Sequence, residues 1–198
     1  MIFDDVAAFS RAISAPVHDS PIRLSEAEVE LRIRLLREEF SEYTDGEHND
    51  DIVEVADALA DMVYIIAGTV VGYGLRSLVQ LPANYGYYHE GTRLGFPSRH
   101  IRAVRQEHIA TAFDTYLGAE KRNELGAIAH ALGDMLIYIS TCATVYGIPL
   151  AAVFDEVHRS NMTKLMPDGS VLRREDGKVL KPPHFSPANI RSVLFPQG

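Results

Sequence analysis

The sequence predicts an all-α protein in which tandem-duplicated helical hairpins form a bundle, followed by a short C-terminal β-hairpin or extended tail. Apolar residues recur at helical spacing along most of the 198 residues, helix-capping residues precede several of these segments, and one segment is repeated later in the chain. The chain is long enough to bury a core, and its hydrophobic content of 46% is typical of a globular protein.

The apolar periodicity and the positions of Gly and Pro place the helices along the chain. We expect helices over 3–13, 25–46, 51–74, 99–117, 121–147 and 149–163. Ser25 followed by Glu28, and Asp51 followed by Glu54, are typical of residues that cap helix N-termini. Residues 81–98 are rich in Tyr, Gly and Pro and are predicted to be a linker. Asp-Gly pairs at 168–169 and 176–177 favour a β-hairpin in the tail.

An internal repeat relates the two halves of the chain. At a shift of 73 residues, 57–75 falls on 130–148 with seven of nineteen positions identical. Further upstream a shift of 68 aligns four residues, which are Ile33, Arg34, Arg37 and Glu39 with Ile101, Arg102, Arg105 and Glu107. We interpret this as a duplicated two-helix unit whose second copy has a loop five residues longer.

The repeat and a change of charge divide the chain into four segments, which we expect to form one compact domain. The segments are a catalytic repeat over 1–80, a linker over 81–98, a degenerate second repeat over 99–154 and a substrate-closing tail over 155–198. The tail holds seven Lys or Arg against five Asp or Glu, whereas the whole chain has a net charge of −8. A basic tail behind an acidic body suits a segment that closes over phosphates.

Carboxylates are concentrated in residues 37–61, which contain ten Asp or Glu. Glu39 and Glu42 lie one turn apart on one predicted helix, and Glu54 and Asp57 do the same on the next. Two such pairs facing each other would supply four hard oxygen ligands for Mg²⁺ or Mn²⁺. Acid-rich helices are more often solvated surfaces, but Asp57 is surrounded by apolar residues, and a buried carboxylate requires a cation.

The pattern Glu38-Glu39-x-x-Glu42 followed by Glu54-x-x-Asp57 resembles the signature of the all-α nucleoside triphosphate pyrophosphohydrolases, which include MazG, the dimeric dUTPases and phosphoribosyl-ATP pyrophosphohydrolase. The stretches "LRIRLLREEFSEY", "VADALADMVYIIAGT" and "HRSNMTKLMPDGS" are similar to the MazG-like subgroup. The resemblance implies a MazG-like helical bundle, dependence on Mg²⁺ with Mn²⁺ as a substitute, and cleavage of the α–β phosphoanhydride to a monophosphate and pyrophosphate.

The resemblance also implies roles for individual residues. Glu39, Glu42, Glu54 and Asp57 would hold metal, and Glu38 is the candidate to orient or deprotonate the attacking water. Asn161 and Lys164 would contact substrate phosphates, and Lys178 and Lys181 of the tail would add positive charge. We interpret Asp61 as structural, because Asp134 repeats it in the second copy. That copy places Glu107, Ala110, Ala127 and His130 at the four ligand positions and is expected not to bind metal.

The substrate and the cellular context stay open at this level. The first choice is a deoxynucleoside triphosphate; phosphoribosyl-ATP and a non-catalytic helical nucleotide-binding or interaction protein are the alternatives. The aromatic linker and the N-terminal helix are both candidate walls of a base pocket. A pI near 5.4 argues against binding to nucleic acid or anionic membranes, and one cysteine with no signal-like N-terminus favours the cytoplasm. A homodimer is left open.

Overall fold

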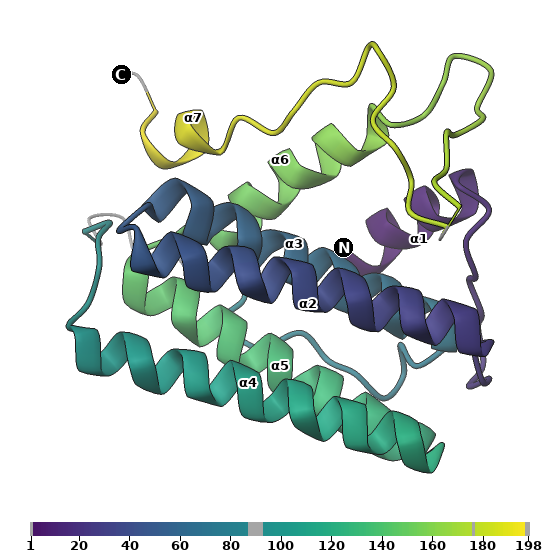
Figure 1. The fold of residues 1–198 in the computed structure, drawn as a ribbon, viewed down its shortest axis with the longest axis horizontal. Coiled ribbons are helices and arrows are strands. Elements are labelled where there is room, and N and C mark those ends of the chain that lie inside the picture. The colour runs from purple at the N-terminus through teal and green to yellow at the C-terminus, as the bar shows by residue number, and fades with distance from the viewer. Residues whose placement is uncertain (1, 87–92, 176, 197–198) are drawn as a thin grey trace.

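The computed structural model describes residues 2–86, 93–175 and 177–196, and within them it is an all-α fold with no sheet (Figure 1). Its helices are α1 (Ile2–Ala12), α2 (Glu26–His48), α3 (Ile52–Tyr73), α4 (Arg99–Arg122), α5 (Leu125–Tyr146), α6 (Leu150–Met162) and α7 (Ile190–Leu194). The hairpin α2–α3 packs on the hairpin α4–α5, while α1 and α6 cover α3 from the other side (Figure 1).

The central element is α3, which contacts α1, α2, α5, α6 and α7. Most of its side chains are fully buried, including Leu59, Met62, Ile66 and Val70. A helix that is apolar on nearly every side must be enclosed by neighbours, and this requirement gathers the other helices around it. The acids on α3 are therefore held in a rigid setting.

Two of the described helices, α3 and α5, are long and apolar enough to cross a bilayer by length and composition alone. Within the protein, 83% of the most apolar stretch of α3 and 56% of that of α5 is buried. A place in a helical core accounts for the same composition.

The two predicted N-terminal caps are confirmed, whereas the helix expected to begin at 121 begins at Leu125, because α4 continues to Arg122. The Ser25 side chain accepts a hydrogen bond from the backbone of Glu28, whose carboxylate accepts from the backbone of Ser25 at 2.9 Å. Asp51 caps α3 by accepting from Val53 and Glu54. The predicted end of α2 near residue 46 is wrong, because the helix continues to His48. Gly46 allows the last turn of α2 to lie close to α3, because a Cβ at this position would lie only 3.0 Å from the Val55 backbone nitrogen.

A single shift of 73 residues aligns the two hairpins, including the turns between their helices. Asp50 and Asn123 both adopt a positive φ in these turns, and α3 and α5 end at left-handed Gly74 and Gly147. The turns between the helices are residues 49–51 and 123–124, so the predicted loop five residues longer in the second copy is wrong.

The upstream alignment failed because several of its positions are exposed, among them Arg37, Ile101 and Glu107, and so carry little packing constraint. In the corrected register the equivalents of the four acids Glu39, Glu42, Glu54 and Asp57 are Ala112, Thr115, Ala127 and His130. The second copy therefore keeps none of the four, rather than one.

Two buried glutamates join the hairpins reciprocally. Glu47, near the end of α2, accepts hydrogen bonds from Tyr43 at 2.9 Å and from Tyr146 of α5. Its equivalent Glu120, near the end of α4, accepts from Tyr73 of α3 at 2.7 and 2.8 Å. Each copy thus supplies a carboxylate to a tyrosine of the other, and these buried hydrogen bonds fix the relative position of the hairpins.

The predicted β-hairpin is not seen among the described residues of the tail, which takes the extended form that was the alternative. In the described part of the tail a single antiparallel bridge joins Arg173 and Val179, and the rest is extended or turn. A longer ladder is limited downstream by Pro182 and Pro183, which have no backbone N–H to donate. The segment instead binds the helices through Lys178, which pairs with Glu38 of α2, and Arg173, which donates to the carbonyl of Ile13.

Tyr146→Phe should destabilise the bundle, because it removes a donor from the buried Glu47 carboxylate. We expect the free energy of unfolding to fall by about 1–3 kcal/mol, measured by urea denaturation. Tyr138→Phe is the matched control, since within the described residues the Tyr138 ring packs on His108 and its hydroxyl makes no hydrogen bond. Equal stability of the Tyr146 variant and the wild type would show that this network does not hold the hairpins together.

Candidate active site

A cavity of about 390 Å³ lies among α1, α2, α3, α6 and the tail. Acids of α2 and α3 form one part of its wall, and lysines that follow α6 form the facing part. The remaining wall is largely apolar and comes from α1 and the first half of α2. The cavity therefore has separate acidic, basic and apolar regions.

The acidic wall consists of Glu39 and Glu42 from α2 and Asp57 and Asp61 from α3. The spacings of three and four residues place each pair on one helix face, and the hairpin brings the faces together. Burial, reinforced by Asp61 and Glu42, raises the pKa of Glu39 to about 9. Burial with the charge of Asp57 raises the pKa of Asp61 to about 7.

The carboxyl groups of Asp57 and Glu54 are buried to different extents. Burial, together with Glu54 and Glu42, raises the pKa of Asp57 to about 6. Glu54 is exposed in the first turn of α3 and does not line the cavity; partial burial and then Glu42 raise its pKa. The predicted quartet is thus brought into one region, with Glu54 at its rim and Asp61 inside.

The carboxylate oxygens of the acidic wall are suitable ligands for a hard divalent cation. Oxygen ligands are those that Mg²⁺ prefers, and the buried Glu39 Oε2 has no hydrogen-bond partner among the residues that the structure describes. The carboxyl groups also disfavour one another's ionisation, which an added cation would relieve. Within the described residues, however, no three Asp, Glu, His or Cys side chains are grouped closely enough to form a ready-made metal site.

The basic wall consists of Lys164, Lys178 and Lys181. Lys164 donates to Asn161 Oδ1 at 2.6 Å; burial lowers the pKa of Lys164, and the charge of Asp61 opposes that shift. Lys181 lies over the Phe185 ring at 5.1 Å. The lysines predicted from sequence therefore face the acids, although the hairpin expected to carry Lys178 and Lys181 is absent from the described tail.

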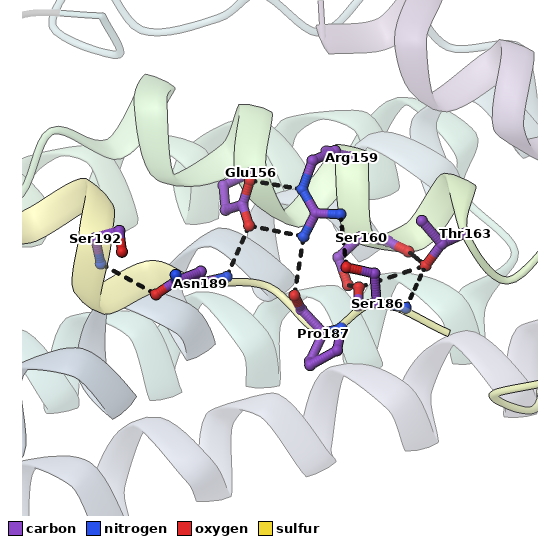
Figure 2. Close-up of polar contacts among 8 residues, drawn as sticks. All are labelled: Glu156, Arg159, Ser160, Thr163, Ser186, Pro187, Asn189 and Ser192. Carbon is purple, nitrogen blue, oxygen red and sulfur yellow. Dashed lines mark hydrogen bonds and ion pairs between the residues drawn. The ribbon is translucent and has the colours of Figure 1, made fainter. Parts of the chain in front are cut away.

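The C-terminal segment is fastened to α6 by a set of polar contacts (Figure 2). Arg159 pairs with Glu156 at 2.8 Å and donates to the carbonyl of Pro187 at 2.9 Å. Ser160 donates to the carbonyl of Ser186 at 2.9 Å. These contacts hold the segment that follows Lys181 against α6, and so position Lys181 and Phe185 at the cavity.

Some site residues differ from the sequence-based expectation. Glu38 is not on the cavity wall and pairs with Lys178, so its role as a base stays a prediction. Asp61 lines the cavity instead of serving only the core; its spacing of four residues from Asp57 was the signal for this. Of the two candidate base walls, the N-terminal helix lines the cavity, while part of the linker, 87–92, lies outside the described residues.

Residues 6–82 match the sequence model of the phosphoribosyl-ATP pyrophosphohydrolase family. The matched family is one of the MazG-like, all-α nucleoside triphosphate pyrophosphohydrolase superfamily. The match covers α2 and α3, and therefore the acidic wall, and it supports a pyrophosphohydrolase-type function on nucleotides.

One relative among curated proteins is an uncharacterized protein of Acanthamoeba polyphaga mimivirus, 27% identical over 153 residues. The alignment covers 69% of this chain and 59% of the mimivirus protein, so the chain spans about three-fifths of that relative's length. No solved structure matches the chain significantly.

The acidic wall predicts a pH-dependent stability. Glu39, Asp57 and Asp61 have folded-state pKa values above their usual values of 4.5 and 3.8. The folded state therefore binds protons more tightly than the unfolded chain, and without metal its stability should fall as pH rises from about 4 to about 9. Mg²⁺ should raise the melting temperature more at about pH 8.5 than at about pH 5.5, because ligands must lose protons.

Scanning fluorimetry in EDTA and in Mg²⁺ at the two pH values measures both effects. Glu39→Gln should flatten the pH dependence, and Glu107→Gln, an exposed acid on α4, should leave it unchanged. A metal-free melting temperature that rises over this pH range would contradict the interpretation.

The contacts of Arg159 predict how firmly the tail is held. Arg159→Met removes the pair with Glu156 and the hydrogen bond to the carbonyl of Pro187, so trypsin should cleave after Lys178 faster than in the wild type. Mass spectrometry over a time course gives the rates. Arg191→Met, which removes another arginine of the tail, is the control; equal cleavage in all three proteins would show that Arg159 does not fasten the segment.

Proposed function

We propose that this protein is a Mg²⁺-dependent nucleoside triphosphate pyrophosphohydrolase that cleaves the α–β phosphoanhydride to a monophosphate and pyrophosphate. The observation that carries the proposal is the single cavity in which Glu39, Glu42, Asp57 and Asp61 face Lys164, Lys178 and Lys181. A triphosphate with a divalent cation matches both sides, because the cation lies against carboxylates and the phosphate oxygens against ammonium groups.

The chain's own residues would act mainly by binding and orientation. Glu39, Glu42, Glu54 and Asp57 would hold the cation, with Asp61 beside them. When bound, Mg²⁺ would supply charge neutralisation and a more acidic bound water. Lys164, oriented by Asn161, would hold the phosphate oxygens through charge-assisted hydrogen bonds. Lys181 would approach from the tail, which the contacts of Arg159 keep in place.

A second candidate substrate is phosphoribosyl-ATP, because the matched family bears the name of that activity. The same bond type would be cleaved at the same acidic wall, and the substrate would differ only at the base end. A non-catalytic nucleotide-binding protein is the remaining alternative, and the assay below separates the three.

Purified protein incubated with the common ribo- and deoxynucleoside triphosphates in Mg²⁺ or Mn²⁺ should release pyrophosphate and the monophosphate. Glu42→Gln should reduce kcat/KM by at least about a hundredfold, because a metal ligand is lost. Lys164→Ala should lose about ten- to a hundredfold, since a charge-assisted hydrogen bond to phosphate is removed. Glu107→Gln and Lys121→Ala, both exposed on α4, are the matched controls.

Calorimetric titration with a non-hydrolysable triphosphate should give one nucleotide per chain, because the second copy lacks the four acids. Cleavage of phosphoribosyl-ATP alone would favour the second candidate. Tight nucleotide binding without any product would favour the non-catalytic alternative and overturn the proposal.

A further inference from the structure

The end of the cavity away from the acids combines apolar walls with the guanidinium of Arg32, and Arg173 of the tail also lines the cavity. Val6 and Phe9 of α1 and Leu35 of α2 line it, and Arg32 of α2 reaches into the same space. Apolar walls with few polar groups are typical of pockets for flat organic ligands, in which the polar groups fix the orientation. This end therefore differs in chemistry from the phosphate end.

The position of the Arg32 guanidinium depends on Gly68 of α3. A Cβ at position 68 would lie 2.9 Å from Arg32 Nη1 and 3.6 Å from a methyl group of Val6. The missing side chain provides the space in which the guanidinium lies against α3. The equivalent position in the second copy is Thr141, so this arrangement belongs to the first copy only.

The guanidinium of Arg32 has no hydrogen bond or ion pair with any described residue. Glu28, one turn earlier on α2, already accepts from the backbone and hydroxyl of Ser25 at 2.9 and 2.7 Å. Arg173 is the nearby cation, and its own donors go to the carbonyls of Ile13 and Gly177. Burial lowers the pKa of Arg32. Because the side chain is partly exposed and lines the cavity, its five N–H donors are available to the acceptors of a ligand bound there.

The spacing along the helices matches a nucleoside. Arg32 lies seven residues before Glu39 on α2, and Gly68 lies seven residues after Asp61 on α3. Seven residues of helix correspond to about 10.5 Å, which is comparable to the reach from an α-phosphate to the far edge of its base. A nucleotide with its phosphates at the acidic and basic walls would therefore place its base beside Arg32.

Resting on the function proposed above, we propose that Arg32, admitted by Gly68, selects the nucleobase by donating to its acceptor edge. Guanine presents two neighbouring acceptors, O6 and N7, which suit a bidentate guanidinium, whereas adenine places an amino donor at the equivalent position. The site thus prefers 6-oxopurine nucleotides over 6-aminopurine nucleotides. A phosphate at the base end is the other ligand that would satisfy Arg32, and the experiment separates the two.

The experiment compares guanosine and adenosine 5′-monophosphates by calorimetric titration, and dGTP and dATP by kcat/KM. The wild type should favour the guanine compounds by about ten- to a hundredfold, the range of a good bidentate contact. Arg32→Met should bring both ratios close to one. Arg37→Met removes the same charge from an exposed position of the same helix and should keep the wild-type preference.

Gly68→Ala tests the same idea without removing the charge. The added methyl group meets only the tip of a flexible side chain, so the helix should persist with an unchanged or higher melting temperature, while the base preference falls as in Arg32→Met. If Arg32→Met does not fold, Gly68→Ala tests the hypothesis in its place.

The outcomes separate the two proposals. Turnover of all triphosphates at equal efficiency, or equal losses for guanine and adenine in the variants, would overturn the base selection and leave the pyrophosphohydrolase activity intact. Binding of inorganic phosphate that Arg32→Met abolishes would also overturn it in favour of an anion site. Discrimination between the monophosphates without any pyrophosphate release would support Arg32 and overturn the proposed activity.

Discussion

Repulsion among the carboxyl groups of Glu39, Asp57 and Asp61 is the constraint on which the arrangement around the cavity depends. Burial is the largest cause of the raised pKa of each group, and the charges of neighbouring carboxylates raise it further. The ionised form of each group is therefore disfavoured when no cation is near. The lysines of the tail reduce this repulsion in part, and a divalent cation would reduce it further. A site that costs stability without its ligand is common where binding is the purpose of the residues.

The rigid bundle is what makes such crowding tolerable. Because α3 is enclosed by five other helices, its acids cannot move apart without disturbing the core. The reciprocal contacts of Glu47 with Tyr146 and of Glu120 with Tyr73 fix the second hairpin against the first. The two copies have therefore diverged in role: the first carries the acids, and the second keeps the tyrosine and glutamate that hold the hairpins together.

The two ends of the cavity also differ in chemical character. Lys164 and Lys181 stand at one end, opposite the acids, and Arg32 stands about two helical turns away among apolar side chains. The tail supplies Lys181 at the first end, and Arg159 and Ser160 fasten it to α6 (Figure 2). If the proposed function holds, phosphate chemistry would fall to the lysine end and base recognition to the Arg32 end, with α2 and α3 contributing to both.

Most of the helices, two of their caps and the acid pairs could be predicted from the sequence, because these depend on local hydrogen bonding and on a spacing of three or four residues. Ser25, Asp51 and the pair Glu39–Glu42 could be interpreted from their neighbours alone. The register of the second copy, the placement of Asp61 in the cavity and the approach of Arg32 to Gly68 became apparent only in the folded chain. These depend on contacts between residues far apart in the chain, and the exposed residues that suggested another register carried no packing constraint to exclude it.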